Sequence, residues 1–251
     1  MLAASHFGKT MPPKTARIPE PGDHGRAIEL LQNHSLTTLV QQELERQIVD
    51  GKLAAGTKLN EADIAAELRV SRGPVREAFR ALDQSGLVRT EKNRGVFVRQ
   101  VTLEEAHEIY EVRAALDELI GRLAARRIGA EQLARLKEIV KKMHAAARTF
   151  DSAAYYPLNI EFHEVLAEAS GNGALIENYR RVVNELNLYR REVLARDSKS
   201  IPLSARDHDE IVKAVAKGDS ALAGRLLFDH VIAGRDRLAR TLHPETAKGK
   251  K

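Results

Sequence analysis

The stretch LNEADIAAELRVSRGPVREAFRALDQSGL, residues 59–87, predicts two short helices that are joined by a sharp turn. Asn60 is a favourable N-cap residue for the first helix, and Ser71 is one for the second. Pro74 falls in the first turn of the second helix, where its missing N–H group is not needed. We therefore expect a helix-turn-helix whose second helix spans residues 71–85.

The second helix carries two stripes on different faces. An apolar stripe repeats at i, i+4 and i+7 and consists of Val75, Phe79 and Leu82. A basic stripe repeats at i, i+4 and i+8 and consists of Arg72, Arg76 and Arg80. The major groove of DNA admits one α-helix, and arginine pairs with the O6 and N7 atoms of guanine. The sequence therefore favours a DNA-reading helix, and the alternative is an ordinary solvated basic face.

This stretch resembles the winged-helix DNA-binding domain of the GntR family of bacterial transcription regulators. The matching residues are Ser71, Arg72, Pro74, Val75, Arg76, Leu82, Gly86, Leu87 and Val88. Two positions depart from the family pattern, because Arg69 replaces the usual glycine and Gly73 replaces the usual threonine. We expect Arg72 and Arg76 to read bases. The other predicted DNA-binding residues are Arg69, Ser71, Gly73, Pro74, Arg94 and Gly95.

The segments around this stretch complete a winged unit over residues 36–101. An amphipathic helix is predicted over 36–50 from apolar residues that recur every four positions, namely Leu36, Val40, Leu44 and Ile48. A β-hairpin is predicted from residues 87–91 and 96–101, with its tip at 92–95. Eight basic residues between positions 69 and 99 form the positive footprint that DNA binding requires. Residues 1–35 are expected to form a disordered or loosely ordered tail.

The composition narrows the class of protein. The chain has 251 residues, of which 43% are hydrophobic, and a net charge of +5. It contains no cysteine, which excludes disulfides and thiolate metal sites and fits a reducing cytoplasm. No apolar run approaches the roughly 18 residues of a membrane span. We expect a cytoplasmic protein without a membrane segment.

The pattern from residue 102 onward is almost wholly helical. Thr102 and Glu105 form a capping box at its start. Helices are expected near 102–128, 131–149, 153–170, 173–197, 203–217 and 219–241. The predicted fold class is mainly α: a winged helix-turn-helix with a small hairpin, followed by an all-helical bundle of about six helices over 102–243. Residues 244–251 form a basic tail.

Three histidines are expected on apolar helix faces in this bundle. His163 lies four residues after Asn159, so the two share a face, while His208 and His230 follow the apolar spacing of their own helices. Imidazole is the commonest metal ligand in proteins, and a helical bundle can hold such a site in its core. Each histidine taken alone could instead be a satisfied core residue.

The spacing of these residues resembles the FCD effector domain of the FadR branch of GntR regulators. The matching runs are Asn159-Ile-Glu-Phe-His163, Ser170-Gly-Asn172, Asp207-His208, His230 and Glu111–Asp117. About six helices are typical of the VanR-like subgroup. The resemblance implies a divalent metal, such as Zn, Ni or Mn, held by Asn159, His163, His208 and His230. Asn159 replaces an aspartate, which should weaken metal binding and favour an anionic ligand.

Arg113 is expected to point inward, because it shares a face with apolar residues three and seven positions further on. A buried arginine needs an anion. That anion is either a carboxylate on a neighbouring helix or, as the resemblance implies, the carboxylate of a bound effector.

The combined hypothesis is a metabolite-responsive transcription regulator and not an enzyme. It would bind operator DNA as a homodimer and be a repressor that a small organic acid releases. Two alternatives remain from the sequence: a metal-dependent enzyme recruited to DNA, and a constitutive DNA-binding protein without a ligand.

Overall fold

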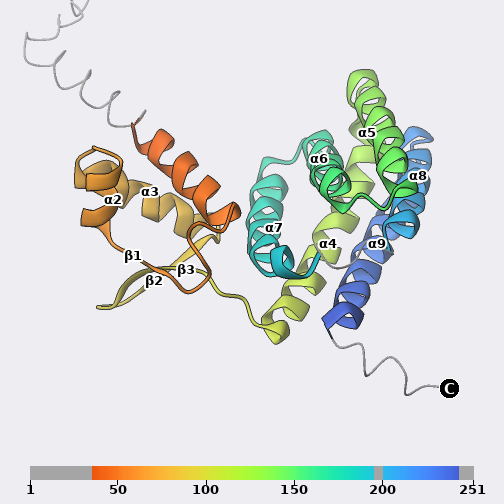
Figure 1. Ribbon diagram of the computed structural model, residues 1–251. Coiled ribbons are helices and arrows are strands. Elements are labelled where there is room, and N and C mark those ends of the chain that lie inside the picture. Colours follow the sequence, from red (N-terminus) through yellow and green to blue (C-terminus); the bar gives the residue numbers. More distant parts are fainter. Residues whose placement is uncertain (1–35, 195–199, 243–251) are drawn as a thin grey trace, which may run out of the picture.

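The computed structural model of the chain describes residues 36–194 and 200–242. The tails expected at 1–35 and 244–251 lie outside these residues. A small winged unit and a larger helical bundle stand side by side in Figure 1, as the fold prediction required. Within the described residues, no helix is long and apolar enough to cross a membrane.

The winged unit is built around one apolar core. Its elements are a helix over residues 36–49, β1 (Lys58–Leu59), α2 (Glu61–Glu67), α3 (Arg72–Gln84), β2 (Val88–Glu91) and β3 (Gly95–Val98). The apolar stripes of the helix over 36–49 and of α3 meet in this core, as their spacing predicted. Leu36 is an exception, because its side chain remains 38% exposed at the start of the first helix.

The predicted hairpin forms, and a third strand joins it. β2 and β3 pair antiparallel, and β1 pairs with the other edge of β3, so the strand order is β1-β3-β2. Only two residues of β1 enter the sheet, opposite Phe97 and Val96. So short a strand has no alternation of apolar and polar residues, and the sequence did not predict it.

The turn between α2 and α3 contains a left-handed residue. Arg69 has a φ angle of 55° and an exposed side chain. Residues other than glycine are disfavoured there because Cβ approaches the backbone carbonyl. The family usually has glycine at this position, and the backbone of this chain explains that preference.

The bundle contains the six helices that were expected, within a few residues of their predicted ends. They are α4 (Leu103–Arg127), α5 (Ala130–Arg148), α6 (Ser152–Ala169), α7 (Gly173–Leu194), α8 (Ile201–Ala216) and α9 (Ser220–Leu242). The predicted capping box forms, since the backbone N–H of Thr102 donates to Glu105 and the backbone N–H of Glu105 donates to the Thr102 hydroxyl. α4 packs against α6, α7, α8 and α9, and its contact with α9 is the most extensive.

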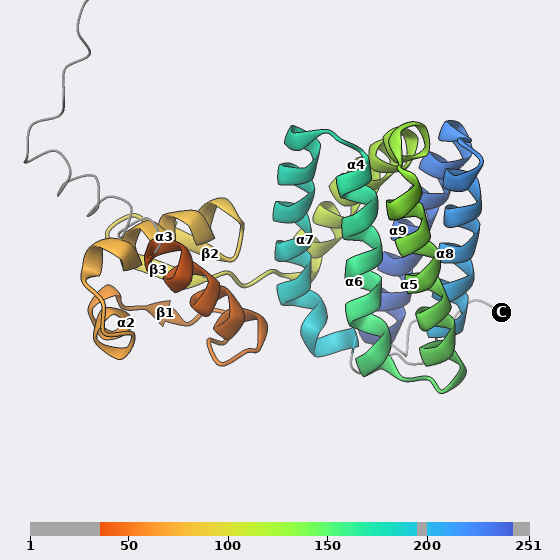
Figure 2. The same cartoon turned by 90° about the horizontal axis from the view of Figure 1, so that it is seen from above.

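α7 is the bundle helix nearest the winged unit in both Figure 1 and Figure 2. The amide of Asn184 donates to the backbone carbonyl of Ser85 at 3.3 Å, and Glu185 forms an ion pair with Arg99 at 3.1 Å. Leu188 packs against the core of the winged unit. One helix of the bundle therefore touches the turn that follows α3.

Candidate functional site

Helix α3 presents its basic face to solvent. Arg72, Arg76 and Arg80 are exposed, while the apolar stripe of the same helix is buried. Ser71 is the N-cap residue by its backbone conformation, but its hydroxyl makes no capping hydrogen bond. An exposed hydroxyl at a helix N-terminus can donate to a phosphate oxygen, next to the backbone N–H groups that favour anions there. Pro74 is buried, which limits its role to shaping the helix start.

Arg76 is held by a carboxylate of the preceding helix. Its Nε donates to Glu61 Oε2 at 3.1 Å, and its Nη2 donates to Glu61 Oε1 at 2.6 Å. This hydrogen bonding lowers the pKa of Glu61 below its usual value. The sequence did not identify Glu61, because residues so far apart in the chain meet only through the packing of α2 on α3.

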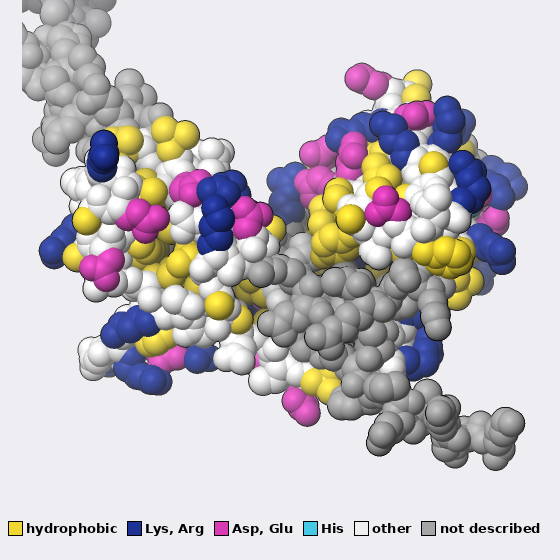
Figure 3. Space-filling view, viewed as in Figure 1, with side chains coloured by type: hydrophobic (Ala, Val, Ile, Leu, Met, Phe, Trp, Pro, Cys, Tyr) yellow, Lys and Arg dark blue, Asp and Glu magenta, His cyan; other side chains and the backbone are white. Residues whose placement is uncertain are grey.

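The wing carries a second basic surface. Lys and Arg side chains gather over the tip of the β2–β3 hairpin, at the lower left of Figure 3. The guanidinium of Arg94 lies 5.7 Å from the centre of the Phe97 ring, and the Lys58 ammonium lies 5.9 Å from it. Gly95 follows the tip with a φ angle of 113°. The aromatic ring thus positions two cations beside the tip.

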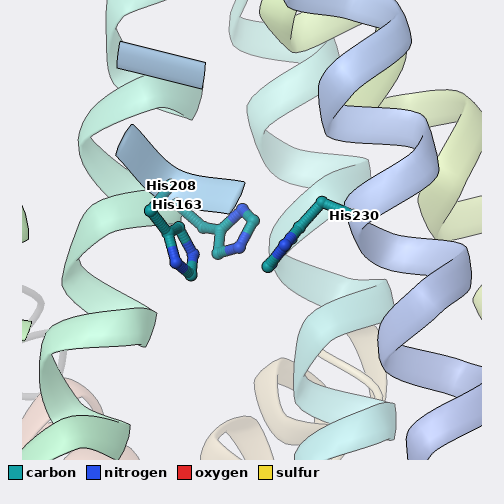
Figure 4. Close-up of side chains that lie close together, drawn as sticks. All are labelled: His163, His208 and His230. Carbon is teal, nitrogen blue, oxygen red and sulfur yellow. The ribbon is translucent and has the colours of Figure 1, made fainter. Parts of the chain in front are cut away.

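The bundle brings His163, His208 and His230 together, as the sequence predicted. They come from α6, α8 and α9, and in Figure 4 their rings point toward one another. One potential ligand atom from each lies within 4.8 Å of the others, and all three side chains are buried. These positions suit three ligands of a single metal ion.

A second set of side chains orients the three rings through their Nδ1 atoms. His163 Nδ1 bonds to Asp117 Oδ1 at 3.1 Å and His230 Nδ1 to Asp207 Oδ2 at 3.2 Å, while His208 Nδ1 lies 3.3 Å from the Tyr155 hydroxyl. Carboxylate partners of this kind fix the tautomer that exposes Nε2 and raise the basicity of metal-ligating histidines. The two carboxylates therefore leave Nε2 of His163 and of His230 as the ligand atoms, while the Tyr155 hydroxyl occupies Nδ1 of His208.

His208 shows most directly that the centre fits a metal. Its Nε2 is buried and has no hydrogen-bond partner among the described residues. Burial, and then the nearby His230 and His163, lower the pKa of His208 well below its usual value, so its ring stays neutral. A neutral imidazole with an unsatisfied buried nitrogen is the form that binds a metal cation.

Arg113 points inward, as expected, but its carboxylate partner is on its own helix. Its Nε donates to Asp117 Oδ2 at 3.2 Å, one turn further along α4. Burial alone would raise the pKa of Asp117, but Arg113 and the bond from His163 outweigh burial and hold the pKa below its usual value. Asp117 thereby links Arg113 to the histidine centre.

Asn159 lies one turn before His163 on α6 and is partly buried. Its side chain takes part in none of the hydrogen bonds found within 36–194 and 200–242. The sequence missed Asp117, Tyr155 and Asp207 as partners of the histidines. The only available signals were that Asp117 is four residues from Arg113 and that Asp207 adjoins His208.

An exposed arginine helix with a wing, joined to a bundle that encloses a buried histidine centre, defines a DNA-binding transcription regulator with a separate ligand-binding domain. Two family descriptions match the chain: "Bacterial regulatory proteins, gntR family" over residues 36–98, and "FCD domain" over residues 108–233. The chain belongs to the GntR family of bacterial transcription regulators and carries the FCD type of effector domain.

Similar proteins agree with this assignment. The chain is 33% identical over 207 residues to a "Probable D-xylose utilization operon transcriptional repressor" of Paenarthrobacter nicotinovorans, which covers 81% of this chain and 88% of the relative. The solved structure of a GntR transcriptional regulator from Rhodococcus sp. RHA1 is 31% identical, with a TM-score of 0.62 over 82% of this chain and 98% of that chain. "E. coli McbR/YncC" shares the fold, with a TM-score of 0.68, 21% identity and coverage of 82% and 98%.

Proposed function

We propose that this protein represses transcription from an operator and is released by a small organic acid that binds beside a divalent metal in the bundle. The winged unit over 36–101 would bind DNA, and the unit over 102–243 would bind the effector and form the homodimer. The observation that carries the metal part of the proposal is the buried Nε2 of His208, which has no hydrogen-bond partner among the described residues and lies in a cluster of three inward-facing imidazoles.

The metal would be held by His163, His208 and His230, with the amide oxygen of Asn159 as a further donor. Nitrogen and oxygen donors without sulfur suit Zn, Ni or Mn. Bound there, the ion would supply a positive charge that attracts an anionic ligand. Because Asn159 is neutral, that charge would not be reduced by a carboxylate ligand from the protein.

The effector's carboxylate would meet Arg113 as well as the metal. The bond from Arg113 to Asp117 uses Nε, so the two Nη groups are the donors that a bidentate carboxylate would take. Asp117 would then act in two ways, by orienting His163 and by holding Arg113 in place.

Metal titration of the purified chain tests this proposal. Calorimetry of chelator-treated protein with Zn²⁺, Ni²⁺ and Mn²⁺ should show one ion per chain, and His208→Ala should abolish high-affinity binding. His144→Ala is the matched control, because His144 is a partly buried histidine that bonds to Asp209 outside the cluster. Absence of ion uptake by the unaltered protein would refute the metal part of the proposal.

The DNA-binding part predicts a sequence-selective loss. Arg76→Ala should reduce operator affinity by about 1–3 kcal/mol, because a guanine contact is lost, and should change affinity for random DNA much less. Fluorescence anisotropy with both DNAs measures the two effects. Equal losses on the operator and on random DNA would contradict base readout by Arg76.

A further inference from the structure

A pocket of about 490 Å³ lies between α5 and α8, on the side of the bundle away from the winged unit in Figure 1 and Figure 2. Pockets that bind small molecules usually have volumes of about 300–1,000 Å³. None of the residues that line this pocket belongs to the histidine centre or to the DNA-binding surfaces. The proposed function therefore makes no use of it.

One face of α5 makes this pocket basic. Lys137, Lys141, His144 and Arg148 follow one another at i, i+4, i+7 and i+11, so they share a helix face, and all four line the pocket. Among the described residues that line the pocket, Asp209 of α8 is the only carboxylate, and its Oδ2 lies 3.0 Å from Nε2 of His144. Three charged side chains of α5 thus face one carboxylate.

These three cations have little compensation elsewhere in the chain. Lys137 and Arg148 form no ion pair with any residue of the described ranges. Lys141 pairs with Glu138 at 3.6 Å, and both of these side chains are exposed, so the pair contributes little to stability. Like charges at i and i+4, such as Lys137 and Lys141, destabilise a helix. An anion bound between them would relieve this repulsion.

The buried part of the pocket lining is apolar. Val140 of α5 is 4% exposed and Val212 of α8 is 7% exposed, and both line the pocket. A ligand can therefore place a short carbon skeleton against these side chains and its charged groups among the surrounding cations. A basic surface that attracts only solvated ions needs no apolar wall of this kind.

We propose that this pocket binds a small organic dianion, a compound with two negative charges on phosphoryl or carboxylate groups and a short carbon skeleton. With His144 neutral, the three cations and one carboxylate of the lining give the pocket a net charge of +2, which a dianion neutralises. A cleft lined by one sign of charge concentrates counter-ions. Lysine and arginine then donate charge-assisted hydrogen bonds to phosphate or carboxylate oxygens.

Calorimetric titration of the full chain, freed of metal by a chelator and kept at about 0.15 M salt to screen weak surface attraction, tests the proposal. The probes are glucose 6-phosphate and succinate, one for each kind of anionic group, and glucose is the uncharged control. At least one of the two anions should bind at one site per chain, and glucose should not bind. Lys141→Ala should weaken binding about tenfold or more, because it removes the central cation. Lys142→Ala is the matched control, since Lys142 is the next residue of α5, is exposed and does not line the pocket.

Two further variants separate a pocket from general attraction to positive charge. Ala145→Trp should abolish binding, because Ala145 is an exposed residue of the lining and a large side chain there fills the pocket without changing its charge. Ala134→Trp, also exposed on α5 but outside the pocket, is its control. Asp209→Asn removes the opposing carboxylate and should strengthen binding, a gain that misfolding cannot produce. The proposal is overturned if neither anion binds, or if Lys141→Ala and Ala145→Trp leave the affinity unchanged.

Discussion

Asn159 stands where the resemblance to metal-binding FCD domains implies an aspartate. Asn159→Asp should raise metal affinity, because a carboxylate replaces a neutral amide oxygen. It should also weaken binding of an anionic effector, since the site then carries one positive charge fewer. Calorimetry with divalent ions and then with organic acids measures both. Asn178→Asp, an exposed substitution on α7, controls for the general change in charge. Affinities that move in the same direction would contradict the charge argument.

Arg69 holds a backbone conformation that suits glycine. Arg69→Gly and Arg69→Ala both remove the guanidinium, but only glycine relieves the close approach of Cβ at a φ angle of 55°. The glycine variant should therefore be more stable than the alanine variant by about 1 kcal/mol. Thermal unfolding of the two proteins compares them directly. A more stable alanine variant would mean that the turn is not strained.

The inward direction of the candidate site residues could be predicted from sequence, but their partners could not. Helical periodicity alone placed His163, His208, His230 and Arg113 on buried faces, because one face of an amphipathic helix is fixed by its apolar residues. Contacts such as Tyr155 with His208 depend on how the helices cross. The crossing angle of two helices is set by the packing of their whole surfaces, so no fixed spacing of residues in the sequence reveals it.

At the scale of elements, the contact between α2 and α3 predicts a pH dependence. The hydrogen bonds from Arg76 lower the pKa of Glu61 in the folded protein. Because the pKa of Glu61 is lower in the folded than in the unfolded chain, the contact stabilises the fold fully at a pH above the ordinary glutamate pKa of about 4.3. This stabilisation is lost as the pH falls through the pKa that Glu61 has in the folded protein. Carbon-13 NMR titration of the Glu61 carboxyl should therefore show a midpoint below the ordinary one.

Arg76→Ala provides the control for that titration, because it removes the hydrogen bonds and keeps Glu61. In this variant the Glu61 midpoint should return to the ordinary glutamate range. An unaltered midpoint would show that Arg76 is not the partner that holds the carboxylate.

The helices were predictable to within a few residues because their ends carry local signals. Thr102 caps α4, Gly129 precedes α5, and Gly218 with a φ angle of 71° separates α8 from α9. β1 lacks such a signal. Its two residues belong to the sheet only because β3 has a free edge beside them, and that edge exists only after the hairpin has formed.

At the scale of the whole molecule, Gly86 of the winged unit lies close to Glu185 of the bundle. A Cβ atom there would lie 2.7 Å from Glu185 Cγ, and the φ angle of 77° is already unfavourable for other residues. Gly86→Ala should therefore destabilise the chain by more than about 1 kcal/mol. Gly173→Ala is the matched control, since a Cβ at Gly173 meets nothing within 4 Å.

A double variant separates the contact from the backbone strain. Glu185→Ala should recover part of the loss in Gly86→Ala, because it removes the side chain that the new Cβ would meet. Thermal unfolding of the two single variants and the double variant gives the coupling. Strictly additive effects would show that Gly86 and Glu185 do not restrain each other.

The order of the two units could be predicted from motifs, but the way they meet could not. The residues that join them, among them Asn184, Glu185 and Leu188, lie in the middle of an ordinary amphipathic helix. Nothing in their spacing distinguishes a surface that contacts another unit from one that contacts water.

α7 has a further consequence, because it interacts with Arg113, which Asp117 links to the histidine centre, as well as with the winged unit. Tyr179 is buried and interacts electrostatically with Arg113, and Glu185 on the same helix contacts the turn after α3, about 9 Å further along the axis. We expect a displacement at one end of this helix to be transmitted to the other end. Coupling between two binding equilibria is reciprocal. If effector binding lowers the affinity for the operator by some factor, operator binding must lower the affinity for the effector by the same factor. Operator-bound protein would then need a higher effector concentration for half-saturation than protein free in solution. The effector concentration that releases the protein from DNA would therefore depend on the affinity for the operator as well as on the affinity for the effector.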